Sequence, residues 1–316
     1  EEFARDRDEL LEMVQNLNWM VIPLSENPCA AAQGALAIEC RSNDNSTKEI
    51  IKSISSFSSM SSIEEERKIL QSYGGGCHQK IGSSVEVLET GLVKTTKGET
   101  EEGRNISKRF FVANKENKTF FSDVSEMNYF PASREEQSFF KRVNLQDTEN
   151  ELPKITNKGI YVSRSNAIGE SIKIDDSNII WTSGVDTWIS LAMKGFWVNG
   201  TSDSLGEKNS PGENPFKDMD WLKVSHADAE NHDIDIIATY KLEPLELKKR
   251  MQSCEYFYWM STSSFKLAID TFPEILTKKH SCGLGNTYDF INGMIPENTF
   301  PCLNYDSWLE QIKANH

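Results

Sequence analysis

One stretch of the sequence places a cysteine where it could carry a covalently attached group. Cys77 follows three glycines in the run from Tyr73 to Gly82, which reads Y-G-G-G-C-H-Q-K-I-G. Glycine accepts backbone angles that other residues avoid, so a bulky group can approach the chain closely there. The same pattern also fits a helix that ends at glycine and is followed by a buried cysteine. These ten residues alone leave both interpretations open.

A second motif lies upstream of the glycine-flanked cysteine. Residues 28–41 read P-C-A-A-A-Q-G-A-L-A-I-E-C-R, and G-G-C-x-x-x-I-G follows further along the chain, with a predicted helix between the two motifs. In this order the two motifs resemble porphobilinogen deaminase (hydroxymethylbilane synthase), in which the cysteine holds a dipyrromethane cofactor through a thioether. The resemblance therefore implies dipyrromethane on Cys77. The chain departs from the family pattern at Ala32, where glycine is usual, and at Lys80, where proline is usual.

The resemblance covers only part of a deaminase. In that family the catalytic aspartate and the arginines that bind substrate carboxylates lie in the first two domains, and no segment here matches them. The resemblance therefore predicts a fragment, with the missing N-terminal deaminase domains as a further partner and with no turnover by the deaminase part alone.

Length and charge restrict the remaining possibilities. The 316 residues suffice for two domains, and the net charge of -14 argues against nucleic-acid or anionic-membrane partners. A ligand that carries several carboxylates would be repelled at long range, so its site must supply local donors. No apolar run approaches the roughly eighteen residues of a membrane span, and no signal-peptide pattern opens the chain.

The six cysteines show no paired spacing. This distribution indicates reduced thiols in a cytoplasmic protein rather than a disulfide framework. Neither Cys77-His78 nor His280-x-Cys282 has a second half at zinc-type spacing, so we expect no metal site.

The first part of the chain predicts a small α+β domain. Apolar spacing predicts an amphipathic helix over residues 1–20, and the A-A-Q-G-A-L-A-I-E-C run predicts a strand over residues 31–40. Further predicted elements are helices at 42–57 and 62–71, the second with a capping box from Ser62 to Glu65, and a hairpin of strands at 84–88 and 91–95. By resemblance, residues 1–40 are the tail of the second deaminase domain and residues 41–103 are the third, cofactor-cysteine domain.

Residues 104–158 carry weaker signals. The polar segments 99–108 and 144–158 predict linkers, and the aromatic-rich segment 110–140 lies between them. We expect its aromatic side chains to pack in a core rather than to form a ligand platform. The whole region is either a linker or the first part of the following domain.

From residue 159 onward, short apolar strands alternate with helices, which is typical of a parallel α/β arrangement. The predicted strands cover residues 159–163, 179–181, 196–198, 234–240 and 256–260. The predicted helices cover residues 188–194, ended by Gly195, and 265–271, capped by residues 261–264 and closed by Pro273, and a third begins at Tyr288.

Several strands end in turns that are rich in Ser, Thr and Gly and that open helices. Such turns present unpaired N–H groups at the positive end of a helix dipole, at the strand ends where ligands of open α/β folds gather. Each turn alone also fits an ordinary helix N-cap. Together they form a repeat: S-N-A-I at 165–168 and S-G-x-x-T at 183–187, then S-T-S-S at 261–264 and G-x-G-N-T at 283–287. The repeat predicts two related lobes with a cleft between them.

This repeat and the A-T-Y-K-L run at 238–242 resemble uroporphyrinogen III synthase, which has two such α/β lobes. The likeness covers residues 159–316, although the 283–287 turn carries one extra residue. The family's first strand is not evident unless the aromatic segment supplies it. The implied fold class is α/β: a small α+β domain followed by a two-lobed, parallel-sheet region.

The synthase converts hydroxymethylbilane into uroporphyrinogen III, with loss of water and inversion of the last pyrrole ring, and needs no cofactor. The resemblance implies that Tyr240 assists departure of the hydroxyl group, with a packing role as the alternative. It also implies a set of residues that hold substrate carboxylates: Ser165, Thr187, Thr262, Ser263 and Thr287. We expect His226 to be an exposed residue of a turn rather than part of the cleft.

The two resemblances belong to successive steps of tetrapyrrole synthesis, so each supports the other. They predict the carboxy-terminal part of a fused deaminase and synthase. The alternative is a module that binds a tetrapyrrole or another carboxylate ligand without converting it.

Overall fold

The computed structural model describes residues 9, 12–13, 17–76, 79–114, 120–122, 124–125, 128–206, 219–229 and 234–315. The chain divides into two compact units: unit 1 comprises Glu1–Pro23 and Lys118–His316, and unit 2 comprises Leu24–Asn117. Cys77 and most of the helix predicted over residues 1–20 lie outside the described residues. Among the described residues, we find no helix with the length and apolarity that a membrane crossing requires.

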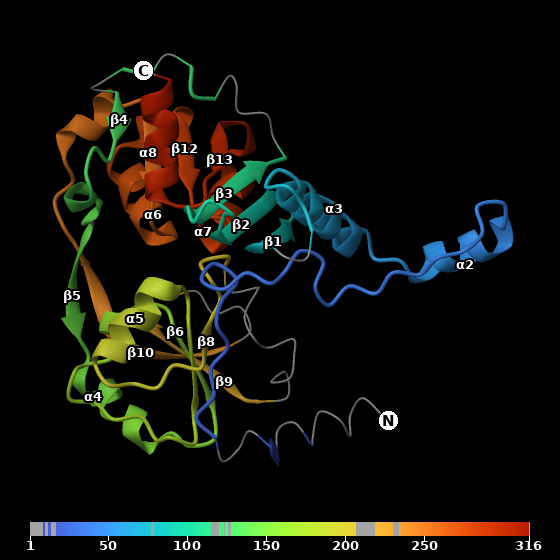
Figure 1. Ribbon diagram of the computed structural model, residues 1–316. Helices are drawn as coiled ribbons and strands as arrows, with labels where there is room; N and C mark the ends of the chain where they lie inside the picture. Colours follow the sequence, from blue (N-terminus) through green and yellow to red (C-terminus); the bar gives the residue numbers. More distant parts are fainter. Residues whose placement is uncertain are drawn as a thin grey trace. The chain divides into compact units, whose positions relative to one another are not determined.

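Unit 2 contains a three-stranded antiparallel sheet in the order β1-β2-β3 (Figure 1). Its strands are β1 (Lys80–Leu88), β2 (Gly91–Glu99) and β3 (Asn105–Ala113). The predicted hairpin is confirmed, and both of its strands are longer than predicted. The linker predicted over residues 99–108 is wrong, because β3 begins at Asn105 and pairs with β2 along its full length. The first residues of β3 are mostly polar and give no strand signal, although apolar residues follow at its end.

Two helices precede this sheet: α2 (Asn45–Ile54) and α3 (Phe57–Gln71). Ser56 caps α3 by accepting a hydrogen bond from the Ser59 N–H at 3.3 Å. The capping box predicted at Ser62 is therefore wrong, because the helix begins earlier and runs through the serines. The strand predicted over residues 31–40 is also wrong, since Leu36 is 96% exposed and the segment pairs with no described strand.

The first lobe of unit 1 is built on a six-stranded sheet in the order β5-β10-β9-β6-β7-β8. Its strands are β5 (Phe140–Asn144), β6 (Gly159–Val162), β7 (Ile179–Thr182), β8 (Gly200–Thr201), β9 (Trp221–His226) and β10 (Asp235–Pro244). All neighbouring pairs are parallel except β5 with β10. The helices of this lobe are α4 (Gln146–Glu149) and α5 (Val185–Met193).

The core of the first lobe includes the apolar run predicted as a strand from residue 159, together with β9, which the sequence analysis did not predict. Ile160, Val162 and Val224 are fully buried there together with Leu191 of α5. Gly195 adopts a φ of 91° after α5, as expected for a glycine that ends a helix. The strand predicted at 196–198 is wrong, because the chain joins the sheet only at Gly200.

The second lobe is built on a four-stranded parallel sheet in the order β13-β12-β11-β4 (Figure 1). Its strands are β4 (Tyr129–Phe130), β11 (Tyr256–Trp259), β12 (Lys279–Cys282) and β13 (Thr299–Pro301), and its helices are α6 (Thr262–Thr271), α7 (Asn286–Met294) and α8 (Tyr305–Ala314). The 3-10 helices of unit 1 are η1 (Arg134–Gln137), η2 (Leu152–Lys154), η3 (Ser165–Ala167), η6 (Lys249–Ser253), η7 (Pro273–Thr277) and η8 (Pro296–Asn298). The α/β class and the parallel sheets predicted from the sequence are thus confirmed.

The aromatic-rich segment supplies core residues, as predicted. Phe121, Phe130 and Phe139 are at most 5% exposed, and Phe130 and Phe139 pack edge to face with ring centroids 6.1 Å apart. The segment also supplies β4 to the second lobe and β5 to the first. The chain thus passes from the second lobe to the first between β4 and β5, and it returns to the second lobe after β10.

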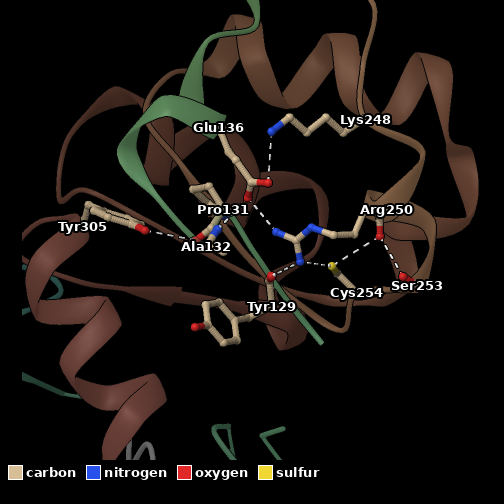
Figure 2. Close-up of polar contacts among 9 residues, drawn as sticks. All are labelled: Tyr129, Pro131, Ala132, Glu136, Lys248, Arg250, Ser253, Cys254 and Tyr305. Carbon is tan, nitrogen blue, oxygen red and sulfur yellow. Dashed lines mark hydrogen bonds and ion pairs between the residues drawn. The ribbon is translucent and has the colours of Figure 1, made fainter. Parts of the chain in front are cut away.

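A polar cluster joins the outgoing and returning connections beside the second lobe. Figure 2 shows Glu136 of η1 between Lys248 and Arg250, its carboxylate accepting hydrogen bonds from Arg250 Nη2 at 2.6 Å and Lys248 Nζ at 3.1 Å. The Ala132 N–H donates to the same carboxylate at 2.7 Å. Arg250 also donates to the Tyr129 carbonyl at 3.0 Å. Burial opposes ionisation of Glu136, but these donors together hold its pKa below the usual value.

We expect the Glu136→Gln substitution to lower the free energy of unfolding by about 2 kcal/mol, because it leaves two cations without their carboxylate. The Glu136 side chain is only 14% exposed, so water replaces the lost partner poorly. Urea denaturation measures the effect. Glu135→Gln, at the exposed neighbouring position, is the matched control and should have a clearly smaller effect, because its contact with Ser133 is local and exposed to solvent. Equal effects of the two substitutions would show that the cluster contributes nothing to stability.

Candidate functional site

A cavity of about 870 Å³ is lined by both lobes of unit 1. The first lobe contributes the ends of β6, β9 and β10, and the second contributes the start of α6 and of α7. The order of the first sheet explains the position of this cavity. From β6 the chain adds β7 and β8 on one side and then β9 and β10 on the other, so the strand order reverses between β6 and β9. Ligands of open α/β sheets bind at the carboxyl ends of strands at such a reversal.

The cavity is locally cationic. Among the described residues, four basic side chains line it, Arg142, Arg164, Lys223 and Lys266, against the two acidic side chains Asp228 and Asp270. This balance contrasts with the net charge of -14 for the whole chain. Arginine binds carboxylate with two parallel hydrogen bonds, and a partly enclosed site strengthens the attraction. The cavity is therefore suited to an anionic ligand.

Tyr240 of β10 lies at the wall of the cavity and is 3% exposed. The guanidinium carbon of Arg142 lies 5.3 Å from the centre of its ring. Burial raises the pKa of Tyr240, although Arg142, Arg164 and a side-chain hydrogen bond with Ser225 act in the opposite direction. The phenol is therefore protonated near neutral pH and can donate a hydrogen bond.

His226 also lines the cavity, at the end of β9. Its ring centroid lies 5.9 Å from that of Tyr240. Burial lowers the pKa of His226, Asp228 opposes this effect, and Lys223 and Arg142 add to it. The expectation that His226 is merely an exposed residue of a turn is thus wrong, because β9 extends as far as this residue and carries it to the cavity wall.

The starts of α6 and α7 both face the cavity. Ser261 caps α6 and accepts a hydrogen bond from the Ser264 N–H at 3.2 Å, within the predicted capping run 261–264, although the helix begins at Thr262 rather than Phe265. Thr262 and Ser263 of the first turn line the cavity, and so does Thr287 of α7. The N-terminal turns of both helices therefore direct N–H groups and hydroxyls toward the same space.

The structure brings four of the proposed site residues of unit 1 together: Tyr240, Thr262, Ser263 and Thr287. Ser165 and Thr187 do not line this cavity. The Ser165 carbonyl accepts a hydrogen bond from Lys194 Nζ at 2.7 Å, and Thr187 is buried in α5 with its hydroxyl 3.5 Å from that of Ser183.

Sequence reasoning missed the basic residues of the cavity. Arg142 lies in β5, within a segment whose fold the sequence left open, and Arg164 is the second residue after β6. The position of Arg164 after a buried strand is a signal that could have identified it. Arg142 gives no comparable signal, because β5 reaches the cavity only through its antiparallel pairing with β10.

In unit 2 the two motifs that contain Cys29 and Gly82 lie against each other. The Ser83 N–H donates to the Cys29 carbonyl at 2.8 Å, and the Ala32 N–H donates to Glu66 Oε2 at 2.8 Å. Ala32 has a φ of 65°, a left-handed conformation that glycine adopts at lower cost, which accounts for the usual glycine at this position. Cys77 itself lies outside the described residues.

The two ring nitrogens of His280, which could have bound a metal, both have hydrogen-bonding partners within the protein. His280 is fully buried, its Nδ1 accepts a hydrogen bond from Trp259 Nε1 at 2.9 Å, and its Nε2 lies 2.9 Å from the Ile275 carbonyl. Across the part of the chain that the structure describes, no group of three or more His, Cys, Asp or Glu side chains is arranged to hold a metal ion.

Comparison with known proteins points to one class of enzyme, those of tetrapyrrole synthesis. No family model matches the chain. Among curated proteins, the chain is similar to porphobilinogen deaminases from Fusobacterium nucleatum (39% identity over 79 residues, 25% of this chain and 26% of the relative) and Natranaerobius thermophilus (30% over 97 residues, 31% of each). A third, from Desulforamulus reducens, is 31% identical over 86 residues, which is 27% of this chain and 28% of the relative. The resemblance to porphobilinogen deaminase is thereby confirmed for a segment, and the chain spans only about a quarter to a third of these relatives.

A solved structure of uroporphyrinogen III synthase from Thermus thermophilus matches with a TM-score of 0.32 and 7% identity, covering 55% of this chain and 83% of that chain. A similarity at this level is too low to establish a shared fold.

Proposed function

We propose that the chain acts in tetrapyrrole synthesis, as part of a fused hydroxymethylbilane synthase and uroporphyrinogen III synthase. Unit 1 would convert hydroxymethylbilane into uroporphyrinogen III in the cavity between its lobes. The observation that carries this proposal is the gathering of four basic side chains in one cavity of an otherwise strongly acidic chain. Hydroxymethylbilane is a linear tetrapyrrole that carries many carboxylates, so it fits such a site.

The reaction requires little acid-base catalysis from the protein. Loss of the hydroxyl group from the substrate leaves a cation that the pyrrole nitrogen itself stabilises. The main task of the site is then to hold the two ends of the substrate together in the correct orientation. Arg142 and Arg164 would bind carboxylates, with the first-turn N–H groups and hydroxyls of Thr262, Ser263 and Thr287 as further donors.

Tyr240 would donate a hydrogen bond to the departing hydroxyl group. Its buried and protonated phenol supports this role, since a donor must keep its proton until the hydroxyl group leaves. Ser165 and Thr187 would contribute only if the substrate extends beyond the cavity, toward the start of η3 and α5.

We expect Tyr240→Phe to lower kcat by about tenfold or more while KM changes little, because it removes only a proton donor. The assay supplies hydroxymethylbilane and separates uroporphyrinogen isomers III and I by chromatography. Tyr129→Phe, in the second lobe and away from the cavity, is the matched control. An unchanged kcat for Tyr240→Phe would remove the proposed role and leave Tyr240 as a packing residue.

The same assay tests the proposed activity itself. Formation of isomer III by the wild-type chain supports a synthase. Binding of hydroxymethylbilane with isomer I as the only product would instead support a module that binds tetrapyrroles or other carboxylates without converting them.

Unit 2 would correspond to the cofactor-bearing part of the deaminase. By resemblance we assign residues 1–40 to the tail of its second domain and 41–103 to its third domain, with 104–158 leading into the synthase-like region at 159–316. The compact units divide the chain differently, because residues 1–23 belong to unit 1 and β3 extends the sheet of unit 2 beyond residue 103. Dipyrromethane would be bound to Cys77, and the N-terminal deaminase domains would be a partner. An intact-mass measurement of the purified chain tests the attachment. The described cysteines form no disulfide with one another, which supports a reducing, cytoplasmic location.

A further inference from the structure

The six-stranded sheet of unit 1 has an edge strand at β8. Asn199 directly precedes this strand and is hydrogen-bonded to the neighbouring strand β7. Asn199 donates its N–H to the Ile180 carbonyl at 2.8 Å, and its Oδ1 accepts from the Ile180 N–H at 2.9 Å. Asn199 is 7% exposed and so is held firmly against β7. These two bonds do not use the Asn199 carbonyl or its side-chain NH2 group, which can therefore bind a segment that lies beyond the edge.

Residues 19–21 occupy this position. The Val21 N–H donates to the Asn199 carbonyl at 2.7 Å, and Asn199 Nδ2 donates to the Trp19 carbonyl at 3.0 Å. The indole N–H of Trp197 donates to the same Trp19 carbonyl at 2.9 Å. The contacts fall on residues 19 and 21, the alternation with which an extended strand presents its backbone groups to a neighbour.

Hydrogen bonds rather than apolar burial define this contact. Met20, Val21 and Ile22 are 43%, 49% and 53% exposed, so side-chain packing contributes little. Backbone pairing of an extended segment with a sheet edge is a recognised mode of peptide binding, in which the main chain supplies the affinity.

We propose that residues 19–21 are a docking strand, which covers the sheet edge where β8 begins and binds the N-terminal segment of unit 1 to the first lobe. Unit 2 begins at Leu24, three residues after Val21. At its other end, Phe121 is buried and stacks on Tyr256 of the second lobe with ring centroids 6.2 Å apart, and the Tyr256 hydroxyl donates to the Ser122 carbonyl. In the sequence, unit 2 is therefore inserted between two segments of unit 1, of which the first binds the first lobe and the second binds the second lobe.

The docking strand can be tested by removing a single donor. Val21→Pro eliminates the N–H that binds Asn199, whereas Ile22→Pro changes the adjacent, equally exposed residue and leaves that N–H in place. The indole N–H of Trp197 reports on docking in the full-length chain, through nuclear magnetic resonance of protein with ¹⁵N-labelled tryptophan. Trp197→Phe identifies its signal among the seven tryptophans.

In the wild-type chain we expect the Trp197 indole proton to exchange with solvent at least about tenfold more slowly than a free indole. Val21→Pro should abolish this protection and shift the signal, and Ile22→Pro should preserve both. Val21→Pro should also raise self-association in sedimentation experiments, because an open sheet edge pairs readily with another chain. Rapid exchange in the wild-type chain, or identical behaviour of the two proline variants, would overturn the proposal.

Discussion

Gly82→Ala is expected to separate the two motifs of unit 2 and to destabilise that unit by about 3 kcal/mol. A Cβ atom at position 82 would lie 2.2 Å from the Pro28 carbonyl oxygen and 3.2 Å from that of Cys29. Both neighbours are backbone atoms, so no side-chain rotation relieves the clash. The chain must instead release the loop around Cys29, with loss of its hydrogen bond from the Ser83 N–H.

Hydrogen exchange measures this effect locally, at the Ser83 and Ala32 amides, whose hydrogen bonds depend on the docked loop. Gly103→Ala is a control in the same unit. Its φ of 76° makes alanine unfavourable, but a Cβ atom there meets nothing closer than 4.0 Å. We expect that control to cost about 1 kcal/mol and to leave the exchange of Ser83 unchanged. Slow Ser83 exchange in Gly82→Ala would show that the loop adapts and that glycine is not required.

The second large effect concerns acid stability. Burial lowers the pKa of His280 from 6.5 to about 4, although a hydrogen bond with the Ile275 backbone opposes the shift. Trp259 can only donate, so Nδ1 accepts and the neutral ring carries its proton on Nε2. As the pH falls below 6.5, the unfolded chain binds a proton that the folded chain excludes. The folded state should therefore lose about 2 kcal/mol between pH 7 and pH 5, and more toward pH 4.

Urea denaturation at a series of pH values measures this loss. His280→Gln tests the assignment, because the amide can accept from Trp259 and donate to Ile275 but does not titrate. The variant should be less stable at pH 7 and should vary less with pH than the wild-type chain. The measurement is best made in a His226→Gln background, since the pKa of His226 is also lowered. If His280→Gln kept the full pH dependence, the acid sensitivity would lie elsewhere.

The sequence predicted best those elements whose signals are local. The strand predicted at 159–163 and the cap predicted within residues 261–264 follow from a short apolar run and from a run of hydroxyl residues before a helix. The structure has the strand at Gly159–Val162 and the cap at Ser261, with the helix beginning three residues earlier than predicted. The cap of α3 was misplaced because several serines in succession offer equivalent starts, and only the docking of the helix chooses among them. The strand expected over residues 31–40 failed because a strand needs a neighbour, which periodicity does not supply.

The cavity depends on pairing between distant segments. Tyr240 was proposed from a family resemblance and Thr262 from its position at a helix start, and both line the cavity. Arg142 was not predicted, because it reaches the cavity through the pairing of β5 with β10, whose partners Asn144 and Tyr240 are far apart in the chain. Pairing at such separation leaves no mark in the local sequence.

The contact between Trp19 and Trp197 spans 178 residues and so has a consequence for protein synthesis. When a ribosome has released the first of these tryptophans, the second has not yet been made. Residues 24–117 are therefore synthesised while the preceding segment is still without its neighbour, and that segment joins the sheet only after β8 has been translated. Until then the nascent chain presents an extended, partly apolar stretch to the chaperones of the cell.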